Sequence, residues 1–526
     1  MSLCFGKNFI YTENSWYSIL SPKEITSISY TRNEVVFSSS NGLFIYDKNS
    51  KDFFYSDYIL NNLDNKYINI VHCDMYRDNI WIANREGLFF KSNLSSVWTK
   101  INFYNLDFNV RSVKNIGSNP DYIIIKTLNN KYIFLDPYTG LVELNMNDDI
   151  IELELMSAKW SSSSKDSQVF NLNNYYAFNG LEIISNNQIK KEGRILYITC
   201  ILEEVEGDRW IGTNSGELFF ISPYSNEVKP LQSIPPIVSM DIAYLDSNKE
   251  WWITDDEFLS GHTDILYTQE SVFLYHWNET ANLWAKHYQD KSPRIFSKDI
   301  NDIYRLNDVL YIATNYGLVI YQLNSNKWLT LDTSDGLPSN IISKIEHYGG
   351  IVYLATTQGL ATLSIKTNNI ISTYLSGVKY AKISDMAFLN EYLYIVSNLG
   401  LIKMDINIDK YMFISNKKFE KIDIKDEYVV LLKNNNLYLL EDDTLNLLFN
   451  YQRLKDFDIC NDYLWAHNAK SAIIYNIISN SRLEYDFSDG IVGSKINHVE
   501  CDDQWVWFST NGGLSFYNWS QFHYED

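Results

Sequence analysis

One pattern of apolar and polar positions recurs along the whole chain. A short apolar strand containing an aromatic residue leads into a Thr, Ser or Asn turn with a glycine, and a second apolar strand follows. The clearest copies read IWIANREGLFF (80–90), LYIATNYGLVIY (310–321), VYLATTQGLA (352–361) and VWFSTNGGLSFY (506–517). Three further good copies and five degraded ones give about twelve units, mostly 35–45 residues apart. Such a period is typical of a repeat architecture.

Each unit predicts four antiparallel strands. An inner strand such as INDIYRL (300–306) precedes the turn, and an outer strand such as NKWLTLD (326–332) follows the second apolar strand. Apolar and polar residues alternate with a period of two, as expected for strands that are buried on one side. A four-stranded repeat of about 40 residues is the pattern of a β-propeller blade. We therefore predict an all-β fold of four-stranded antiparallel blades.

The number of units predicts two rings, because propellers usually have four to eight blades. The strand pattern is interrupted by charge and proline at QDKSPRIF (289–296). This break predicts a first propeller over 1–290 and a second over 291–526, each of about six blades. In the alternative, residues 9–20 complete the C-terminal blade, so that one ring contains both termini. The alternative requires Trp16–Leu20 to pair near Ser515–Tyr524.

The best units resemble the two-component regulator propeller repeat. The resemblance rests on SDGLPSNIISKIEHYGGIVYLATTQGLA (334–361) and SDGIVGSKINHVECDDQWVWFSTNGGLSFY (488–517), and in weaker form it covers nearly the whole chain. In that family, propellers usually form the extracytoplasmic sensor half of hybrid two-component systems, which are linked to oligosaccharide recognition. A similar propeller pair occurs in a surface component of the type IX secretion machinery. No kinase or membrane helix follows Tyr517, so the resemblance implies sensing through another protein.

Charge narrows the range of partners. The 526 residues include 65 acidic and 44 basic ones, for a net charge of -21, which argues against nucleic acids and anionic membranes as partners. Proteins, neutral oligosaccharides and cations remain. No run of about 18 apolar residues predicts a membrane-spanning helix. The aromatic content of 15% is explained by packing between blades.

Two observations bear on localisation, and they disagree. The resemblance implies the periplasm or the cell surface. The first residues of the chain, however, lack the pattern of a signal peptide, and the five cysteines are widely spaced, odd in number and without a CxxC motif. Those features favour reduced, buried thiols and leave the cytoplasm open.

The sequence contains no recognisable catalytic motif. HExxH, GxSxG and P-loop patterns do not occur. His72 and His498 lie on predicted inner strands and are the histidines that could reach a central channel, although core or surface positions explain them better. The repeated Gly, Trp and Asn residues are expected to be structural. We therefore predict a protein that is not an enzyme and that has no obligatory cofactor.

One acidic stretch suggests a divalent cation. It lengthens the hairpin of the sixth unit and supplies hard oxygen ligands and one imidazole. The candidate ligands are Asp255, Asp256, Glu257, His262 and Asp264. Their spacing does not match the EF-hand loop, and a solvated acidic loop is the alternative.

The same face of the ring is expected to bind the main ligand. In a meander alternate turns fall on one face, so the DGLPSN connection, the Thr-Asn-x-Gly turns and the loop 254–270 lie together. Aromatic side chains near these loops can stack on sugar rings or anchor a protein, although packing between blades explains them equally well. The candidates are Trp160, Trp251, Trp252, Tyr267 and Tyr316.

These observations leave three functions. The first is a non-catalytic binding protein, possibly an accessory sensor, that recognises a glycan or a protein partner. The second is a structural scaffold of a cell-surface or secretion assembly. The third is a propeller-type polysaccharide lyase or hydrolase with a site at the mouth of the channel.

Overall fold

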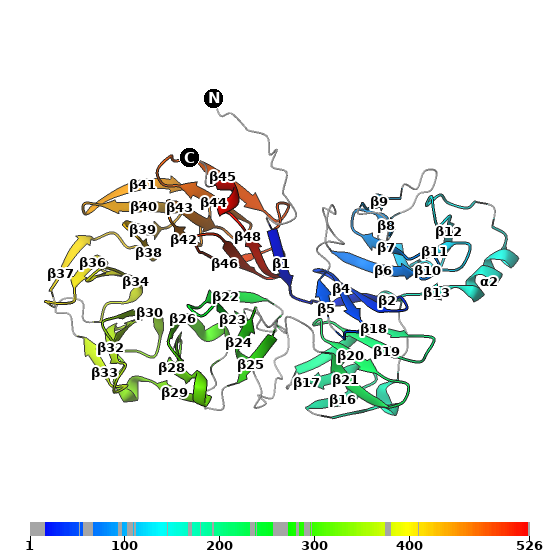
Figure 1. The fold of residues 1–526 in the computed structure, drawn as a ribbon, viewed down its shortest axis with the longest axis horizontal. Coiled ribbons are helices and arrows are strands. Elements are labelled where there is room, and N and C mark those ends of the chain that lie inside the picture. The colour runs from blue at the N-terminus through cyan, green and yellow to red at the C-terminus, as the bar shows by residue number, and fades with distance from the viewer. Residues whose placement is uncertain are drawn as a thin grey trace. The chain divides into compact units, whose positions relative to one another are not determined.

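The fold is described from a computed structural model (Figure 1). The described residues are 16–51, 53–55, 67–92, 97–101, 109, 112–144, 146–166, 171–178, 180–191, 194–231, 237, 239–255, 272–279, 283–288, 295, 297–373, 380–408 and 410–523. Nearly all regular structure is β-strand. None of the helices within these ranges has the length and apolar character needed to cross a bilayer.

The chain divides into two compact units. The larger unit contains the described residues of 1–18, 239–261 and 270–526, and the smaller unit contains those of 19–238. The division therefore falls near residue 238, and not at residue 290 as the interrupted pattern suggested. The sheets β22–β25 and β26–β29, which flank residues 289–296 in the sequence, belong to the same unit. Charge and proline can interrupt a connection within a ring as readily as one between rings.

The larger unit has seven four-stranded sheets in its described residues. Six are meanders in sequence order: β22–β25 (Met240–Leu245, Glu250–Asp255, Val272–Asn278, Leu283–Tyr288), β26–β29 (Ile300–Leu306, Val309–Thr314, Gly317–Gln322, Lys327–Leu331), β30–β33 (Ile342–Tyr348, Ile351–Thr356, Gly359–Ser364, Ile370–Thr373), β34–β37 (Ile383–Leu389, Tyr392–Ser397, Gly400–Asp405, Lys410–Ser415), β38–β41 (Lys421–Lys425, Tyr428–Lys433, Asn436–Glu441, Thr444–Asn450) and β42–β45 (Asp456–Cys460, Tyr463–His467, Ser471–Asn476, Arg482–Asp486). The seventh contains β46 (Ile496–Cys501), β47 (Val506–Thr510), β48 (Gly513–Tyr517) and β1 (Trp16–Leu20).

These seven sheets form a closed β-propeller. The first strand of each sheet lies nearest the centre of the unit in Figure 1, and β22 contacts β46, which joins the first sheet to the last. The core lies between neighbouring blades. One apolar cluster, for example, combines Tyr311 and Leu318 of one blade with Ile345 and Leu354 of the next. This packing accounts for most of the buried aromatic side chains.

Strand β1 completes the last blade of this ring. The strand order is β1-β48-β47-β46, so the start of the described chain is the outer strand beside β48, as the alternative division expected. The ring of Trp16 lies 4.6 Å from that of Tyr517, and the ring of Tyr17 stacks at 4.3 Å on that of Phe516. Closure of the ring therefore depends on two segments at opposite ends of the sequence.

The smaller unit has four sheets in its described residues. They are β14-β2-β3-β4-β5 (Ser162–Ser163, Ile25–Tyr30, Glu34–Ser39, Gly42–Asp47, Phe53–Tyr55), β6–β9 (Ile68–Asp74, Asn79–Asn84, Leu88–Ser92, Thr99–Lys100), β12-β11-β10-β13 (Tyr132–Leu135, Ile123–Thr127, Val113–Ser118, Lys159–Trp160) and β15-β21-β20-β19-β18-β17-β16 (Tyr176–Ala177, Glu227–Leu231, Leu218–Ile221, Arg209–Thr213, Arg194–Glu203, Gln188–Lys191, Leu181–Ser185). The units expected at 175–184 and 209–220 share the last of these sheets. The described sheets of the whole chain therefore number eleven, close to the expected twelve.

The remaining elements are short helices. They are α2 (Asp148–Ser157), α3 (Ser520–His523) and the 3-10 turns η2 (Leu172–Asn174), η3 (Ser297–Asp299), η4 (Leu323–Ser325) and η5 (Thr333–Asp335). Among the helices of the described residues, only α2 exceeds one or two turns, and none of its residues is buried.

The repeated hairpin turns have a common design. In the turn after β27, the Thr314 hydroxyl donates to the Gly317 carbonyl at 2.7 Å, and Thr356 and Thr510 do the same in their own blades. Gly317 has a φ of 125°, and a Cβ there would lie 2.3 Å from the Leu331 carbonyl oxygen. Glycine is required at this position for both reasons, which explains why the sequence repeats it.

Carboxylates on the innermost strands link neighbouring blades of the larger unit. Each accepts a hydrogen bond from a backbone N–H of the next innermost strand. The pairs are Asp302 with Ile345 (2.8 Å), Asp385 with Ile422 (2.8 Å), Asp423 with Ile459 (3.0 Å) and Asp458 with Cys501 (2.7 Å). We call these four bonds the aspartate links. They satisfy N–H groups that would otherwise be costly to bury.

The aspartate links predict a stability effect. In Asp385→Ala the Ile422 N–H loses its acceptor, so the free energy of unfolding should fall by about 2 kcal/mol. Asp385→Asn keeps an acceptor oxygen and should cost less. Chemical denaturation measures both, with exposed Asp503→Ala as the control. Equal stability of the Asp385→Ala and Asp503→Ala variants would contradict a linking role.

The closing strand gives a second prediction. Trp16→Ala removes a ring that contacts Tyr485, Phe508 and Tyr517, so the free energy of unfolding of the larger unit should fall by about 3 kcal/mol. Tyr224 is 97% exposed, and Tyr224→Ala is the matched control with little expected effect. Urea denaturation followed by tyrosine and tryptophan fluorescence makes the measurement. An unchanged midpoint for Trp16→Ala would show that β1 does not hold the ring closed.

Candidate functional site

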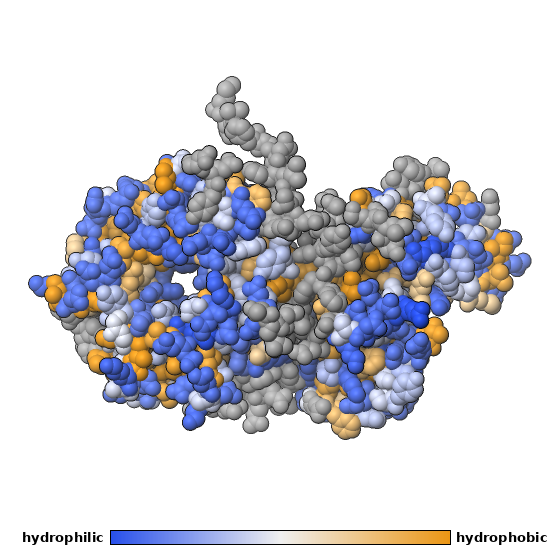
Figure 2. All heavy atoms as spheres, in the orientation of Figure 1, coloured by the Kyte–Doolittle hydropathy of each residue, from blue (hydrophilic) through white to orange (hydrophobic). Residues whose placement is uncertain are grey.

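Ionisable side chains converge at the centre of the larger unit. Figure 2 shows an opening there that is bordered on several sides by hydrophilic residues. The innermost strands contribute carboxylates and lysines that act electrostatically on one another across the ring. This channel cluster consists of Asp302, Lys344, Glu346, Asp385, Lys421, Asp423, Asp456, Asp458, His498 and Glu500.

Most of the channel cluster is engaged in holding blades together. Four of its aspartates make the aspartate links. Lys344 Nζ lies 3.2 Å from Asp302 Oδ1 and so joins two blades by an ion pair. Lys421 Nζ pairs with the Asp456 carboxylate and also donates to the Phe457 carbonyl at 2.9 Å. These contacts support a structural role for the charges of the channel.

Two glutamates of the channel cluster have strongly raised pKa values. Burial raises the pKa of Glu346 and that of Glu500 to about 8, against the partial opposition of Lys344. Glu500 Oε2 is buried and has no hydrogen-bond partner among the described residues. Burial also raises the pKa of Asp385 to about 6. The channel therefore binds protons that the same side chains would release in water at neutral pH.

The two inner-strand histidines belong to different units. His72 belongs to the smaller unit, where its Nε2 lies 2.8 Å from the Ser118 hydroxyl. His498 belongs to the larger unit, with its Nε2 3.6 Å from Asp456 Oδ2. Burial lowers the pKa of each to about 4, so both are neutral at pH 7. The expectation that the chain is not an enzyme stays a prediction.

The two predicted tryptophans of the sixth unit are core residues. Trp251 and Trp252 lie in β23 and are 2% and 1% exposed. Trp251 Nε1 donates to Glu279 at 3.2 Å, and Trp252 Nε1 donates to Asp246 at 2.7 Å. Neither ring is available for stacking on a sugar. Both rings instead contribute to the packing between blades.

The other predicted aromatic residues are scattered. Trp160 lies in β13 of the smaller unit and pairs with Gly117 of β10, so it belongs to a strand and not to a binding loop. Tyr316 is 43% exposed at the turn after β27 of the larger unit, as expected for a binding residue. Tyr267 lies outside the described residues. Of the described members, Trp160 belongs to the smaller unit, and Trp251, Trp252 and Tyr316 belong to two blades of the larger unit.

The predicted cation site is mostly outside the described residues. Asp255 ends β23 and is partly buried. Asp256, Glu257, His262 and Asp264 are not among the described residues, so this site stays a prediction.

A groove that the sequence analysis did not identify lies on the larger unit. Its volume is about 1000 Å³, and it spans the blades β34–β37 and β38–β41 and the turn after β42. Six of the residues that line it are acidic: Asp426, Glu427, Glu441, Asp442, Asp443 and Asp462. We call it the acidic groove. All of these residues except Asp462 are exposed.

Apolar and aromatic side chains also line the acidic groove, although Tyr394 and Leu440 are only 4% and 7% exposed. Tyr394, Tyr428 and Leu440 contribute to its lining. The Tyr428 hydroxyl donates to Asp462 at 2.9 Å, which fixes one carboxylate in the wall. Lys403 is the one basic residue among the described lining residues, and its Nζ lies 4.5 Å from the ring centre of Tyr392.

Strand order places the acidic groove opposite the expected binding face. Its acidic turns join first to second strands (426–427 and 461–462) or third to fourth strands (442–443). The Thr-Asn-x-Gly turns join second to third strands, which lie at the other end of each sheet. The available signal was the recurrence of acidic residues at turns on one side of successive strands, here DE (426–427), EDD (441–443) and ND (461–462).

The shifted glutamates give a third prediction. An unfolded glutamate releases its proton near pH 4, whereas folded Glu500 holds its proton up to a pKa of about 8. Its contribution to stability is present below pH 4 and is lost as the pH rises to about 8. Glu500→Gln should therefore raise Tm at pH 8 and flatten the fall of Tm between pH 5 and pH 8, as calorimetry would show. Exposed Glu441→Gln is the control, and identical pH slopes in both variants would refute the assignment.

No family model and no curated protein matches the chain. Among solved structures, PorZ from Porphyromonas gingivalis, described as a bacterial surface component of the type-IX secretion system, has a TM-score of 0.51 and 11% identity, over 96% of this chain and 87% of that chain.

Two structures of the extracellular domain of BT4673 from B. thetaiotaomicron are also similar. They are described as parts of a one-component and a hybrid two-component system, with TM-scores of 0.43 and 0.44 and identities of 11% and 12%. They cover 98% and 94% of this chain and 76% and 70% of those chains. At such identities the likeness concerns the fold, and the chain shares its all-β, multi-bladed architecture with PorZ along nearly its whole length.

Proposed function

We propose that the chain is a non-catalytic binding protein whose acidic groove holds a basic segment of a protein partner. The observation that carries this proposal is the groove itself, in which six carboxylates from three successive turns surround an apolar wall. A groove of this volume accommodates several residues of an extended peptide. Lysine or arginine side chains would meet the carboxylates, and their aliphatic stems would cover the tyrosines.

The charge of the whole chain supports a cationic partner. A net charge of -21 attracts a basic segment over a distance and so accelerates its encounter with the groove. The effect should weaken as salt is added, because exposed charges are screened beyond about 10 Å at 0.1 M.

A glycan is the less favoured ligand of this site. Sugar recognition by stacking needs exposed aromatic faces, and Trp251 and Trp252 are buried. Tyr316 remains as an exposed aromatic residue on the opposite face, so an oligosaccharide could bind there only through a different set of contacts.

The acidic groove is also compatible with the second candidate function, a structural scaffold. A protein that holds a basic segment of a neighbour can act as a structural component of an assembly, and the likeness in fold to a secretion component favours this second candidate. A periplasmic or surface location is part of this proposal, because a disulfide joins Cys460 to Cys501 and disulfides persist in oxidising compartments.

Binding of a defined basic peptide tests the proposal. The probe is a fluorescein-labelled eight-residue peptide of alternating Lys and Ser, and fluorescence anisotropy measures its Kd. The variant Glu441→Gln/Asp442→Asn/Asp443→Asn should weaken binding about tenfold, since each lost charge contact is worth about 0.5 kcal/mol. Asparagine suits the positive φ of Asp442 and Asp443, so the turn should survive.

The control variant removes three negative charges from a surface outside the acidic groove. Asp148→Asn/Asp149→Asn/Glu152→Gln changes three exposed carboxylates on α2 of the smaller unit and should leave the Kd nearly unchanged. Equal weakening by the two variants would mean that net charge, and not the groove, attracts the peptide. Oligosaccharide binding that survives in the groove variant would favour the glycan alternative.

A further inference from the structure

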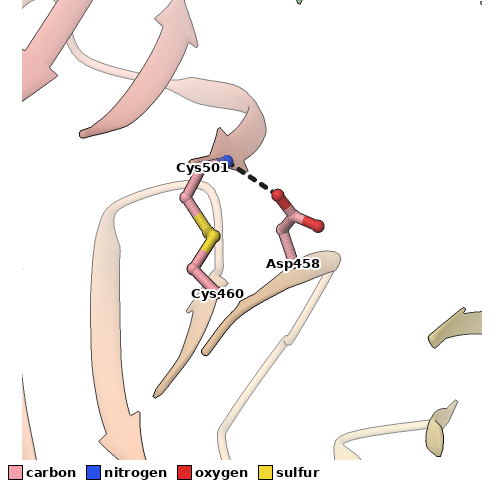
Figure 3. A group of neighbouring side chains, drawn as sticks. All are labelled: Asp458, Cys460 and Cys501. Atoms are coloured by element: carbon pink, nitrogen blue, oxygen red, sulfur yellow. Dashed lines mark hydrogen bonds between the residues drawn. A yellow bond between two sulfur atoms is a disulfide. The ribbon is translucent and has the colours of Figure 1, made fainter. Parts of the chain in front are cut away.

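A sulfur pair joins the last two blades of the larger unit beside one of the aspartate links. Cys460 ends β42 and Cys501 ends β46, and they form a disulfide with their Cα atoms 6.1 Å apart (Figure 3). Asp458 Oδ2 accepts a hydrogen bond from the Cys501 N–H at 2.7 Å, as the dashed line in Figure 3 marks. One carboxylate oxygen and the two sulfurs all lie within 4.8 Å of one another.

We propose that Asp458, Cys460 and Cys501 form a binding site for Zn²⁺ whenever the two cysteines are reduced. The two thiols would each lose a proton and bind the ion as thiolates, and the carboxylate would supply an oxygen ligand. This ligand set suits zinc, which takes sulfur at about 2.3 Å and carboxylate oxygen at about 2.1 Å in a tetrahedral arrangement. The site is independent of the acidic groove and of its proposed function.

The fold brings the three ligand side chains together. In the disulfide the two sulfurs are bonded to each other, and tetrahedral zinc needs them about 3.8 Å apart, so reduction must first let them separate. The two strands are positioned by the Asp458 link and by packing around Trp465, Val499 and Phe508 of the same apolar cluster. Breaking the S–S bond therefore frees the sulfurs to turn about their side-chain bonds while the strands stay in place.

The surroundings favour a cation. Asp423 and Glu500 act electrostatically on Asp458, and Lys421 only partly offsets their charge. A divalent ion would relieve the repulsion among these carboxylates. Asp458 is partly exposed, so an ion can reach it through the channel.

The other described cysteines lack such surroundings. Cys73 and Cys200 are buried free thiols of the smaller unit, and burial raises the pKa of each to about 12. Among the described residues, neither belongs to a group of three ligand side chains close enough to share an ion. They therefore serve as internal controls for thiol chemistry.

Metal binding by the full chain under controlled redox conditions tests the site. The protein is reduced with a phosphine, which does not itself offer thiols to the metal, and is dialysed against Zn²⁺ before elemental analysis. We expect one Zn²⁺ per reduced chain and almost none per oxidised chain. With Cd²⁺ in place of Zn²⁺, the reduced chain should also show the ultraviolet charge-transfer band of a cadmium thiolate.

Variants assign the ligands. Cys460→Ser/Cys501→Ser should abolish stoichiometric binding, Asp458→Asn should weaken it by at least tenfold, and Cys73→Ala/Cys200→Ala should bind as the unchanged chain does. A reduced chain with a native circular dichroism spectrum that binds no Zn²⁺, or binding that survives in Cys460→Ser/Cys501→Ser, would overturn the proposal. If that double variant does not fold, the cadmium thiolate band of the unchanged chain is the test instead. Absence of this band from the reduced chain at saturating Cd²⁺ would also overturn the proposal.

Discussion

The hydrogen bond that an inner-strand aspartate accepts from a backbone N–H of the next blade joins four pairs of neighbouring blades in the larger unit. The hydrogen-bond ladder of one blade does not continue into the next, so side-chain contacts hold neighbouring innermost strands together. An aspartate such as Asp385 supplies that connection and satisfies a buried N–H group. The same requirement brings carboxylates together at the centre, where Lys344 and Lys421 offset part of their repulsion. The shifted proton affinity of the channel is thus a consequence of how the ring is joined.

Local features of this fold could be predicted from the sequence, because each depends on a few neighbouring residues. The glycine of the hairpin turn, for example, is required by the backbone of its own blade, so Gly317 and its counterparts mark the repeat. The division between units could not be predicted in the same way. It depends on which distant strands pair, and the interruption at 289–296 has the same composition whether it lies within a ring or between rings.

The candidate sites also could not be predicted fully from the sequence, because they depend on residues that are far apart in the chain. Trp251 and Trp252 were close to an irregular loop in sequence, but burial depends on the neighbouring blade, which periodicity along one strand does not reveal. The acidic groove is assembled from turns about 15 to 35 residues apart, such as those at Asp426, Asp442 and Asp462, and each turn alone resembles an ordinary solvated loop. The pairing of Cys460 with Cys501 likewise needs the three-dimensional structure, since a separation of 41 residues, about one blade repeat, does not show that the two side chains meet.

The position of β1 has a consequence for the order of folding during synthesis. Ser18 leaves the ribosome first but contacts Ser515, which is made 497 residues later. The smaller unit is translated between the two, so it can fold while the larger ring is still open. Until β48 emerges, β1 has no partner and the outer edge of the last blade does not exist. Closure of the larger ring therefore waits for the synthesis of β48, and a chain arrested before residue 513 would present an unpaired strand to its neighbours.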